Sequence, residues 1–366
     1  MKIVCSKDNL IEGINIVQKA VSTKTSMPIL EGILIEAGDV LKLTGNDLEI
    51  AIECIVDAEI SEKGAIVLNA RMFGDIIRRL PDSDVFIETQ DNDMVTIECE
   101  NSHFEIKGIK AEGYPSIPEI EKEHCFTTTQ KLIREMIRQT IFAVATDDFR
   151  PVLTGTYIEV KGKEINFVAI DGYRGALRKS TTDQDIADFS VIVPAKTLNE
   201  VVKILQPVDE ELTISSSKNQ IMFDAGKFRV FSRLIEGEYL NYRVIFPKEY
   251  ETKITVNTKS MLSSIERAYL ITQEEKDRIF PIKFDIKNDK LIISSNTPSG
   301  SVREEILVQM EGNNLEIGFN PRYFIDALKV IDDESIEVLF TSNLLPCSIK
   351  PIDSDAFSYM ILPFRI

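Results

Sequence analysis

The segments ARMFGDIIRRLP (70–81), AKTLNEVVKILQ (195–206) and PRYFIDALKVID (321–332) are three copies of one pattern, offset by 125 and then 126 residues. Each copy has a basic residue at its second position, another seven residues later, an acid between them and apolar residues around them. These residues are Arg71, Asp75 and Arg78, then Lys196, Glu200 and Lys203, then Arg322, Asp326 and Lys329. Because a helix turns by about 100° per residue, a seven-residue step returns to within about 20° of the same face. The pattern therefore predicts three helices, each with two cations on one stripe.

The similarity between the copies extends to a block that precedes each of them. The blocks are 27–53, 150–178 and 280–306, and they match at Pro28 and Pro151, Gly32 and Gly155, Glu36 and Glu159, and Asp47 and Asp171. The third block keeps Pro281 but has no matching glycine. Apolar and polar residues alternate in these blocks around short turns, and 85–107 alternates in the same way around a turn at 90–93. This alternation is typical of antiparallel hairpins with one solvated face.

Each repeat also opens with an amphipathic helix, expected at 7–20, 130–143 and 259–270. Ser6, a threonine of 127–129 and Thr258 are the expected N-caps. Each repeat thus consists of two helices packed on antiparallel sheet, which is an α+β layer unit. We expect three tandem domains at 1–122, 123–247 and 248–366, because Pro- and acid-rich connectors lie near 115–123 and 247–251.

Charge is segregated between these elements. The chain has 366 residues and a net charge of −17, yet the six expected helices hold 14 basic and 7 acidic residues. The acidic total argues against general adhesion to nucleic acid or anionic membranes. The N-terminus lacks a secretory pattern, no apolar run approaches the roughly 18 residues of a membrane span, and the five cysteines show no CxxC spacing. These features indicate a cytoplasmic protein with reduced thiols.

No motif for catalysis, cofactor binding or metal binding stands out. The sequence has no GxxxxGK[ST] or GxGxxG loop, and its two histidines, His103 and His124, do not have zinc-ligand spacing. Asp171–Gly172 could be a catalytic turn, but Asn46–Asp47 occupies the same place in the first repeat, which favours a structural turn. We therefore expect no enzymatic activity, no cofactor and no metal.

The basic stripes allow two interpretations. On one helix, two cations and an acid are an ordinary ion-paired surface. The same arrangement in three repeats, together with Lys131, Arg134 and Arg138 on a leading helix, favours a shared positive surface. Such a surface attracts phosphate without reading bases. The competing hypothesis is an acidic repeat scaffold that binds only proteins.

At this point the chain resembles the bacterial replicative sliding clamp family, the beta subunits of DNA polymerase III. The resemblance covers the whole chain and includes PxLxGxxIE at 28–36 and 151–159, DGYR at 171–174, EIGFNPRY at 316–323 and the tail YMILPFRI at 359–366. It implies a non-enzymatic processivity factor whose two protomers close head-to-tail into a ring of DNA-clamp domains around duplex DNA, without sequence specificity. A separate ATP-driven loader is expected, because no phosphate-binding loop is visible.

The stripes and the resemblance together define candidate DNA-binding residues. They are Lys24, Arg71, Arg78, Arg79, Lys131, Arg134, Arg138, Lys196, Lys203, Arg267, Arg322 and Lys329. Asp147 stands where the family has a neutral polar residue. The resemblance also implies a dimer interface in which Phe104 and Ile106 of one protomer meet Leu270 and Ile271 of the other, although ordinary core positions for these four remain an alternative.

The resemblance further implies a pocket between the second and third domains that binds short linear motifs of polymerase, clamp loader and repair proteins. Its residues would be Leu153, Ile170, Gly172, Tyr173, Arg174, Leu177, Leu240, Tyr242, Val244, Ile245, Asn320, Tyr323, Leu344, Pro346, Met360, Ile361, Leu362, Pro363, Phe364 and Arg365. Leu240 and Val244 stand where the family often has proline and arginine. For the tail we expect a partly open sheet edge, and the alternative is a last core strand.

Overall fold

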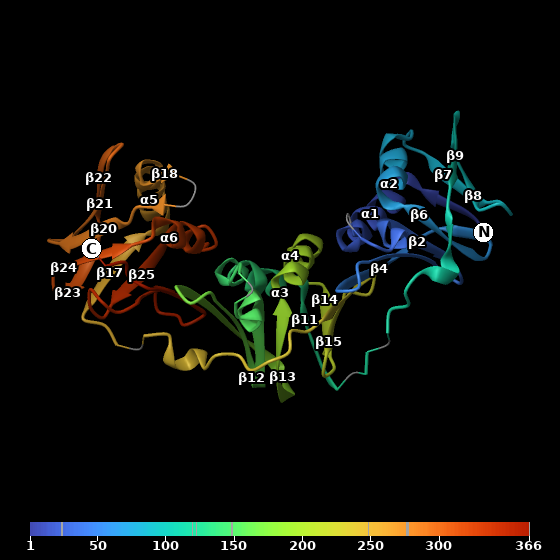
Figure 1. The fold of residues 1–366 in the computed structure, drawn as a ribbon. Coiled ribbons are helices and arrows are strands. Elements are labelled where there is room, and N and C mark those ends of the chain that lie inside the picture. Colours follow the sequence, from blue (N-terminus) through green and yellow to red (C-terminus); the bar gives the residue numbers. More distant parts are fainter. Residues whose placement is uncertain are drawn as a thin grey trace. The chain divides into compact units, whose positions relative to one another are not determined.

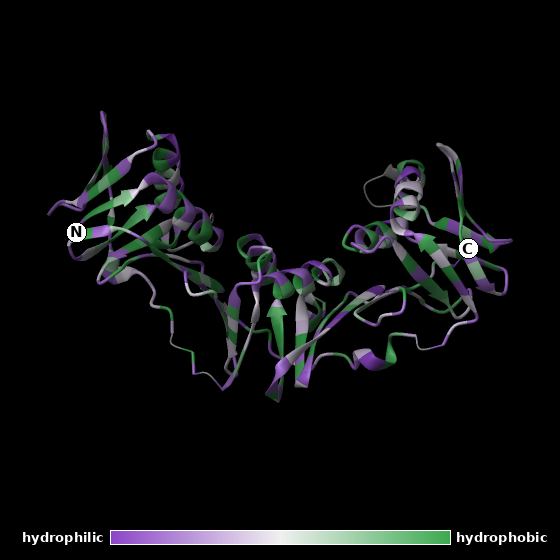
Figure 2. Cartoon of the chain, turned by 180° about the vertical axis from the view of Figure 1, so that it is seen from behind, coloured by the Kyte–Doolittle hydropathy of each residue, from purple (hydrophilic) through white to green (hydrophobic). Residues whose placement is uncertain are grey.

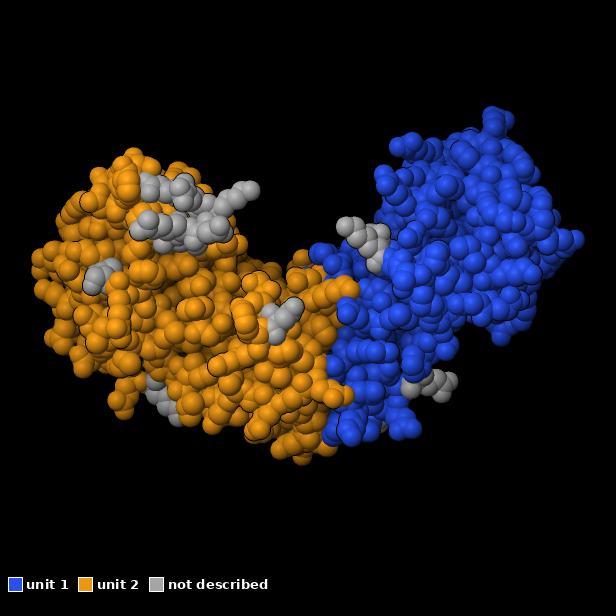
Figure 3. All heavy atoms as spheres, viewed as in Figure 1, with its two compact units in different colours: residues 1–132, 200–234 blue, residues 133–199, 235–366 orange. Residues whose placement is uncertain are grey.

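The computed structural model describes residues 1–365 except 23–24, 119, 122, 148, 248 and 276–277. The chain divides into two compact units (Figure 3), one made of residues 1–132 and 200–234 and the other of residues 133–199 and 235–366. Each unit combines helices with antiparallel sheets, as Figure 1 shows. The α+β class expected from the sequence is therefore confirmed.

The first unit contains two antiparallel sheets. The five-stranded sheet has the order β5 (Glu59–Glu62), β1 (Lys2–Ser6), β7 (Asp84–Thr89), β8 (Met94–Cys99) and β9 (Ser102–Lys107). The nine-stranded sheet has the order β10 (Ile109–Lys110), β6 (Gly64–Asn69), β2 (Gly32–Ala37), β3 (Leu41–Asn46), β4 (Ile50–Val56), β16 (Phe228–Arg233), β15 (Gln220–Asp224), β14 (Glu211–Ser216) and β11 (His124–Thr129). Strands β7 to β9 confirm the hairpins expected at 85–107, and the pairing of β4 with β16 joins strands of the first two repeats.

Helices α1 (Lys7–Val17) and α2 (Ala70–Arg79) belong to the first unit. Each is capped by a side chain that accepts a backbone N–H, Ser6 from Asn9 and Asn69 from Met72. Helix α1 packs closely on β4, since a Cβ at Gly13 would lie 2.6 Å from a methyl group of Val56. Burial of the apolar side of α2 leaves its cations on the opposite, exposed side.

The second unit contains a seven-stranded sheet, a four-stranded sheet and a two-stranded ribbon. The seven-stranded sheet has the order β12 (Gly155–Ile170), β13 (Arg174–Pro194), β27 (Phe357–Ile361), β26 (Cys347–Pro351), β25 (Ser335–Phe340), β17 (Thr252–Asn257) and β23 (Gln309–Gly312). The others are β22 (Gly300–Leu307), β21 (Lys290–Thr297), β20 (Ile282–Lys287) and β24 (Leu315–Phe319), and β18 (Gln273–Glu275) with β19 (Arg278–Ile279). The pairing of β13 with β27 joins strands of the second and third repeats.

Four further α-helices occur in the described residues. They are α3 (Gln130–Arg138) and α4 (Ala195–Ile204), which have residues in both units, and α5 (Thr258–Thr272) and α6 (Pro321–Leu328) in the second unit. Short 3-10 turns lie at Gln18–Ala20, Pro28–Glu31, Ala111–Gly113, Ile141–Ala143, Pro151–Thr154 and Tyr242–Val244. Figure 2 shows hydrophobic and hydrophilic residues alternating along many strands, as expected for sheets with one buried face.

The helix predictions hold, with differences at three ends. The segments expected at 7–20 and 130–143 continue past Val17 and Arg138 only as separate 3-10 turns. The predicted cap at Thr258 is wrong. Asn257 caps α5 by accepting the backbone N–H of Ser260, while the Thr258 hydroxyl donates to the Asp333 carbonyl. Local pattern did not reveal that distant acceptor.

The turns at Asp47 and Asp171 have the same construction. Asp47 Oδ1 accepts the N–H groups of Glu49 and Ile50, and Asp171 Oδ1 accepts those of Tyr173 and Arg174. The residue after each aspartate is left-handed, with φ of 76° at Leu48 and 94° at Gly172. These bonds confirm the structural turn expected at Asp171–Gly172.

Candidate functional site

The predicted basic positions lie on helices, and most of their side chains are exposed. Exposed cations are Arg71, Arg78 and Arg79 on α2, Lys131 on α3, Lys196 and Lys203 on α4, Arg267 on α5, and Arg322 on α6, with Lys329 just beyond it. Arg134 and Arg138 on α3 are half-buried. Lys24 lies outside the described residues. Each helix thus presents positive charge on the side opposite its buried face.

The acids between these cations pair differently in the three repeats. Asp75 lies 3.5 Å from Arg78 and Glu200 lies 2.7 Å from Lys203, each one helical turn away. In the third repeat Asp326 instead pairs with Arg174 at 2.6 Å, and Lys329 pairs with Glu266 of α5 at 3.0 Å. Exposed pairs of this kind contribute only about 0–1 kcal/mol, so the ammonium and guanidinium groups can exchange an acid for a phosphate at small cost.

Arg174 is the most densely contacted residue among the predicted peptide-binding positions. Its guanidinium donates to Asp171 at 3.0 Å, to Asp326 at 2.6 Å and to the Phe142 carbonyl at 2.7 Å. The same group lies 4.7 Å from the ring centroid of Tyr323 and 5.5 Å from that of Phe142. Planar donors and flanking rings hold arginine more firmly than lysine could be held there. Arg174 therefore connects the DGYR turn to α6.

The other predicted peptide-binding residues divide into a buried floor and an exposed rim. Buried side chains are Leu153, Ile170, Leu177, Tyr242, Met360 and Ile361. Exposed apolar side chains are Tyr173, Leu240, Val244, Leu344, Leu362 and Phe364, and the rings of Tyr173 and Tyr323 stack with centroids 6.5 Å apart. Gly172 and Pro363 are also at the surface, as is Arg365, while Ile245, Asn320 and Pro346 are half-buried. All of these residues belong to the second unit, and their exposed apolar area is the kind that marks interaction sites.

The tail differs from the open edge expected from the sequence. Strand β27 is an interior strand, because it pairs with β13 on one side and with β26 on the other. Beyond it, Leu362 donates its N–H to the Tyr173 carbonyl at 2.9 Å and Phe364 donates to the Gly318 carbonyl at 2.7 Å. The open-edge prediction is therefore wrong for the strand, and the exposed apolar residues are those that follow it. A partner strand far away in sequence could not be inferred from the tail itself.

A buried carboxylate holds the connector that carries Tyr242 and Val244. Glu159 accepts the Tyr242 hydroxyl at 2.7 Å and both terminal nitrogens of Arg243, the farther at 3.2 Å. Burial by itself would raise the pKa of Glu159, but the hydrogen bonds from Arg243 and Tyr242 lower it below the ordinary value of 4.5. Sequence reasoning missed this role, although the match of Glu159 with Glu36 across two repeats was a signal that the position is structural.

The four predicted interface residues are not core residues. Phe104 is exposed and Ile106 half-buried on β9, the edge strand of its sheet. Leu270 is 72 % exposed and Ile271 half-buried in the last turn of α5. Apolar side chains on an edge strand and a helix end are available for contact with another chain.

The remaining candidate chemistry is sparse. His103 lies on β9 with Nδ1 2.9 Å from Glu98, as expected for a surface hairpin residue. In the described ranges no group of three or more His, Cys, Asp or Glu side chains is placed to hold a metal ion. None of the helices in the described part of the chain combines the length and apolar composition that a membrane crossing requires.

Helices with exposed cations, packed on antiparallel sheets, and an apolar patch around Arg174 define a protein of the DNA sliding-clamp class. The fold matches the crystal structure of the DNA polymerase sliding clamp from Bacillus subtilis with a TM-score of 0.95 and 37 % identity, over 100 % of this chain and 99 % of that one. It matches the Pseudomonas aeruginosa sliding clamp bound to griselimycin with a TM-score of 0.95 and 28 % identity over all of both chains.

The sequence matches three profiles of the DNA polymerase III beta subunit, for its N-terminal domain over residues 1–118, its central domain over 127–241 and its C-terminal domain over 243–365. Curated relatives named beta sliding clamp are 38 % identical in Bacillus subtilis and 37 % identical in Halalkalibacterium halodurans, over the full length of both chains. The chain belongs to the DNA polymerase III beta subunit family.

Proposed function

We propose that this chain is a cytoplasmic, non-enzymatic DNA processivity clamp. Two copies close head-to-tail into a ring around duplex DNA, and each copy consists of three clamp domains at 1–122, 123–247 and 248–366. Membership of the beta subunit family supports this proposal, and the five cysteines are free thiols, as a reducing compartment requires. The observation that carries it is the exposed basic stripe at equivalent helix positions of three repeats.

The electrostatic role of these helices is to attract the phosphate backbone without fixing a register on it. Contacts to phosphate carry no sequence information, so a protein held by them can move along the duplex. Retention then depends on enclosure, and affinity for open linear DNA stays weak. Closure of the ring would cover Phe104, Ile106, Leu270 and Ile271 and the edge strand β9.

The test neutralises Arg71, Arg78, Lys196 and Lys203 together by glutamine. Retention on nicked circular DNA after loading should fall sharply, whereas polymerase-peptide binding and the dimer should remain. The matched control neutralises four cations placed outside the helices, Lys63, Lys283, Lys290 and Lys350. Equal losses in both variants would show that the stripe has no special role. A native mass of about twice 41.4 kDa is expected, and a stable monomer would contradict the ring.

The second function is the capture of partner peptides at the patch around Arg174. Short linear motifs of the replicative polymerase, the clamp loader and repair proteins would place apolar side chains over Leu177 and Met360, against the exposed Leu362 and Phe364. Deleting residues 362–366 should abolish binding of a polymerase peptide and leave the dimer intact, because those residues lie beyond the interior strand β27. Unchanged peptide capture by the deletion variant would remove this assignment.

A further inference from the structure

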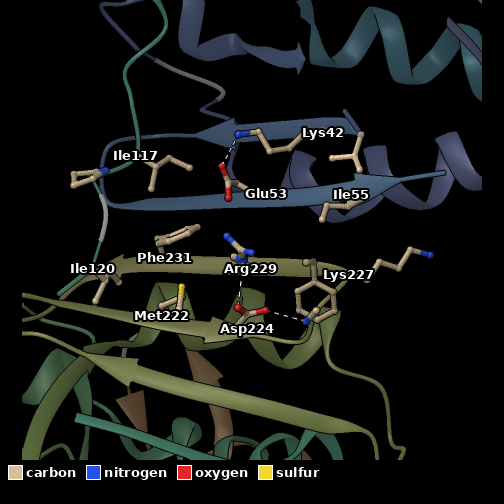
Figure 4. A pocket seen from close by; sticks show the side chains of 14 residues that line it. Lys42, Glu53, Ile55, Ile117, Ile120, Met222, Asp224, Lys227, Arg229 and Phe231 are labelled. Atoms are coloured by element: carbon tan, nitrogen blue, oxygen red, sulfur yellow. Dashed lines mark hydrogen bonds and ion pairs between the residues drawn. The ribbon is translucent and has the colours of Figure 1, made fainter. Parts of the chain in front are cut away.

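A groove in the first unit lies where the nine-stranded sheet passes from the first repeat to the second. Figure 4 shows it between the connector residues Ile117 and Ile120 and the strands β4, β16 and β15. Its volume is about 630 Å³. Phe231 and Met222 lie side by side on neighbouring strands and form an apolar floor. The groove contains none of the residues assigned above to DNA, dimer or peptide binding.

The strand pairing beneath this groove repeats the pairing beneath the peptide site. In the first unit β4 and β16 place Ala51 opposite Phe231 and Glu53 opposite Arg229. In the second unit β13 and β27 place Gly175 opposite Met360 and Leu177 opposite Ser358. Alignment of the two Asp turns and of Phe228 with Phe357 makes these pairs equivalent, so Phe231 occupies the place of Met360.

The two connectors are equivalent as well. One reads EGYPSIPEI at 112–120 and the other EGEYLNYRVI at 236–245. Tyr114 donates its hydroxyl to the Thr44 carbonyl at 3.2 Å and Tyr239 donates to the Val168 carbonyl at 3.4 Å, at matching positions of β3 and β12. Each tyrosine fixes the start of a connector that then runs along a junction between repeats. The groove is therefore the internal counterpart of the peptide site.

The chemistry of the groove differs from that of its counterpart. Glu53 stands where the peptide site has Leu177, and Arg229 stands where it has Ser358. Glu53 is covered and pairs with Lys42 at 3.0 Å, and Asp224 is covered and pairs with Arg229 at 3.3 Å. The side chains of Arg229 and Lys227 are each 47 % exposed, against 17 % for Glu53 and 23 % for Asp224. A ligand thus meets an apolar floor and cationic ends.

We propose that this groove is a second peptide-docking site, which takes an extended segment of a partner protein with an apolar residue beside an acidic one. The apolar residue lies over Phe231 and Met222, and the carboxylate approaches Arg229 and Lys227. The inference rests on the proposed function only for the kind of ligand, because the pairing and the charges are properties of the groove itself. A clamp with two such sites per copy can hold two partners, or two motifs of one partner, at once.

The experiment selects heptapeptides from a displayed library on the full-length wild-type protein, with counter-selection on the variant Lys227→Glu/Arg229→Glu. Enriched peptides are then titrated into the protein labelled at its nine methionine methyl groups. Met222 lies in this groove and Met360 in the peptide site, so their methyl signals report the two sites separately. The matched control is Lys283→Glu/Lys290→Glu, which reverses two lysines of the four-stranded sheet.

The expected peptides combine Asp or Glu with Leu, Ile or Phe, shift the Met222 signal and leave Met360 unshifted. Their affinity should fall at least tenfold in the Lys227→Glu/Arg229→Glu variant and remain unchanged in the control. Arg229→Gln, which keeps the size of the side chain, should give a smaller loss in the same direction. The proposal is overturned if no peptide survives counter-selection, if the peptides shift only Met360, or if they bind the variant equally. A polymerase peptide that fails to shift Met360 would count instead against the proposed function.

Discussion

Replacing Glu159 by glutamine should loosen the connector that forms one wall of the peptide site. The carboxylate is 5 % exposed and accepts hydrogen bonds from Tyr242 and Arg243. Glutamine keeps an acceptor for Tyr242 but removes the charge that Arg243 requires. Hydrogen bonds to charged groups contribute about 1.5–3 kcal/mol. Because Arg243 is 48 % exposed and partly screened by water, we expect a loss at the lower end, about 1.5–2 kcal/mol.

The loss should be visible in thermal unfolding of the second unit. For a unit of roughly 200 residues, about 2–4 °C of Tm corresponds to each kcal/mol, so a decrease of about 4–6 °C is expected. Lys161 also contacts Glu159, at 3.3 Å, but its side chain is 51 % exposed. Lys161→Gln is therefore the matched control, with an expected change within about 0.5 kcal/mol.

The pH dependence of this prediction follows from the lowered pKa of Glu159. A carboxyl group whose pKa is lower in the folded state stabilises the fold fully above its unfolded pKa, and this contribution is lost as the pH falls through the folded value. The difference in unfolding free energy between wild type and Glu159→Gln should thus be largest near pH 7 and shrink below pH 4.5. A difference that stays constant from pH 7 to pH 3, or one below 0.5 kcal/mol at pH 7, would refute the reasoning.

Three further predictions concern the turn, the thiols and the arginine of the second site. Gly172→Ala should cost about 1 kcal/mol in denaturant unfolding, because Gly172 has a φ of 94°, whereas Gly38→Ala, where a Cβ has room, should cost less than about 0.5 kcal/mol. Cys125 is exposed and should react first with a thiol reagent at pH 8, while Cys5, which is buried and whose pKa burial raises to about 11, should react only on unfolding; equal rates would contradict this order. Arg174→Lys should weaken polymerase-peptide binding about tenfold by calorimetry without changing the native mass, since lysine cannot reproduce the planar contacts, and unchanged affinity would separate Arg174 from the site.

Much of this architecture is local and could be predicted from the sequence. The helices follow from periodicity, the exposed cations from the stripe opposite each apolar face, and the turn at Asp171 from its counterpart at Asp47. Repetition strengthened each of these predictions, because an interpretation that is ambiguous in one helix is tested three times in one chain. The resemblance to sliding clamps supplied the residues of the peptide site, which no local pattern marks as a group.

Tertiary structure decided which partners those local elements found. Asp326 has the same place in its helix as Asp75 and Glu200, yet it pairs with Arg174, 152 residues away. The tail is an interior strand because β13 lies beside it, and the groove over Phe231 exists because β16 pairs with β4. Periodicity determines which face of an element is apolar, but the choice of neighbour depends on packing between segments far apart in the chain.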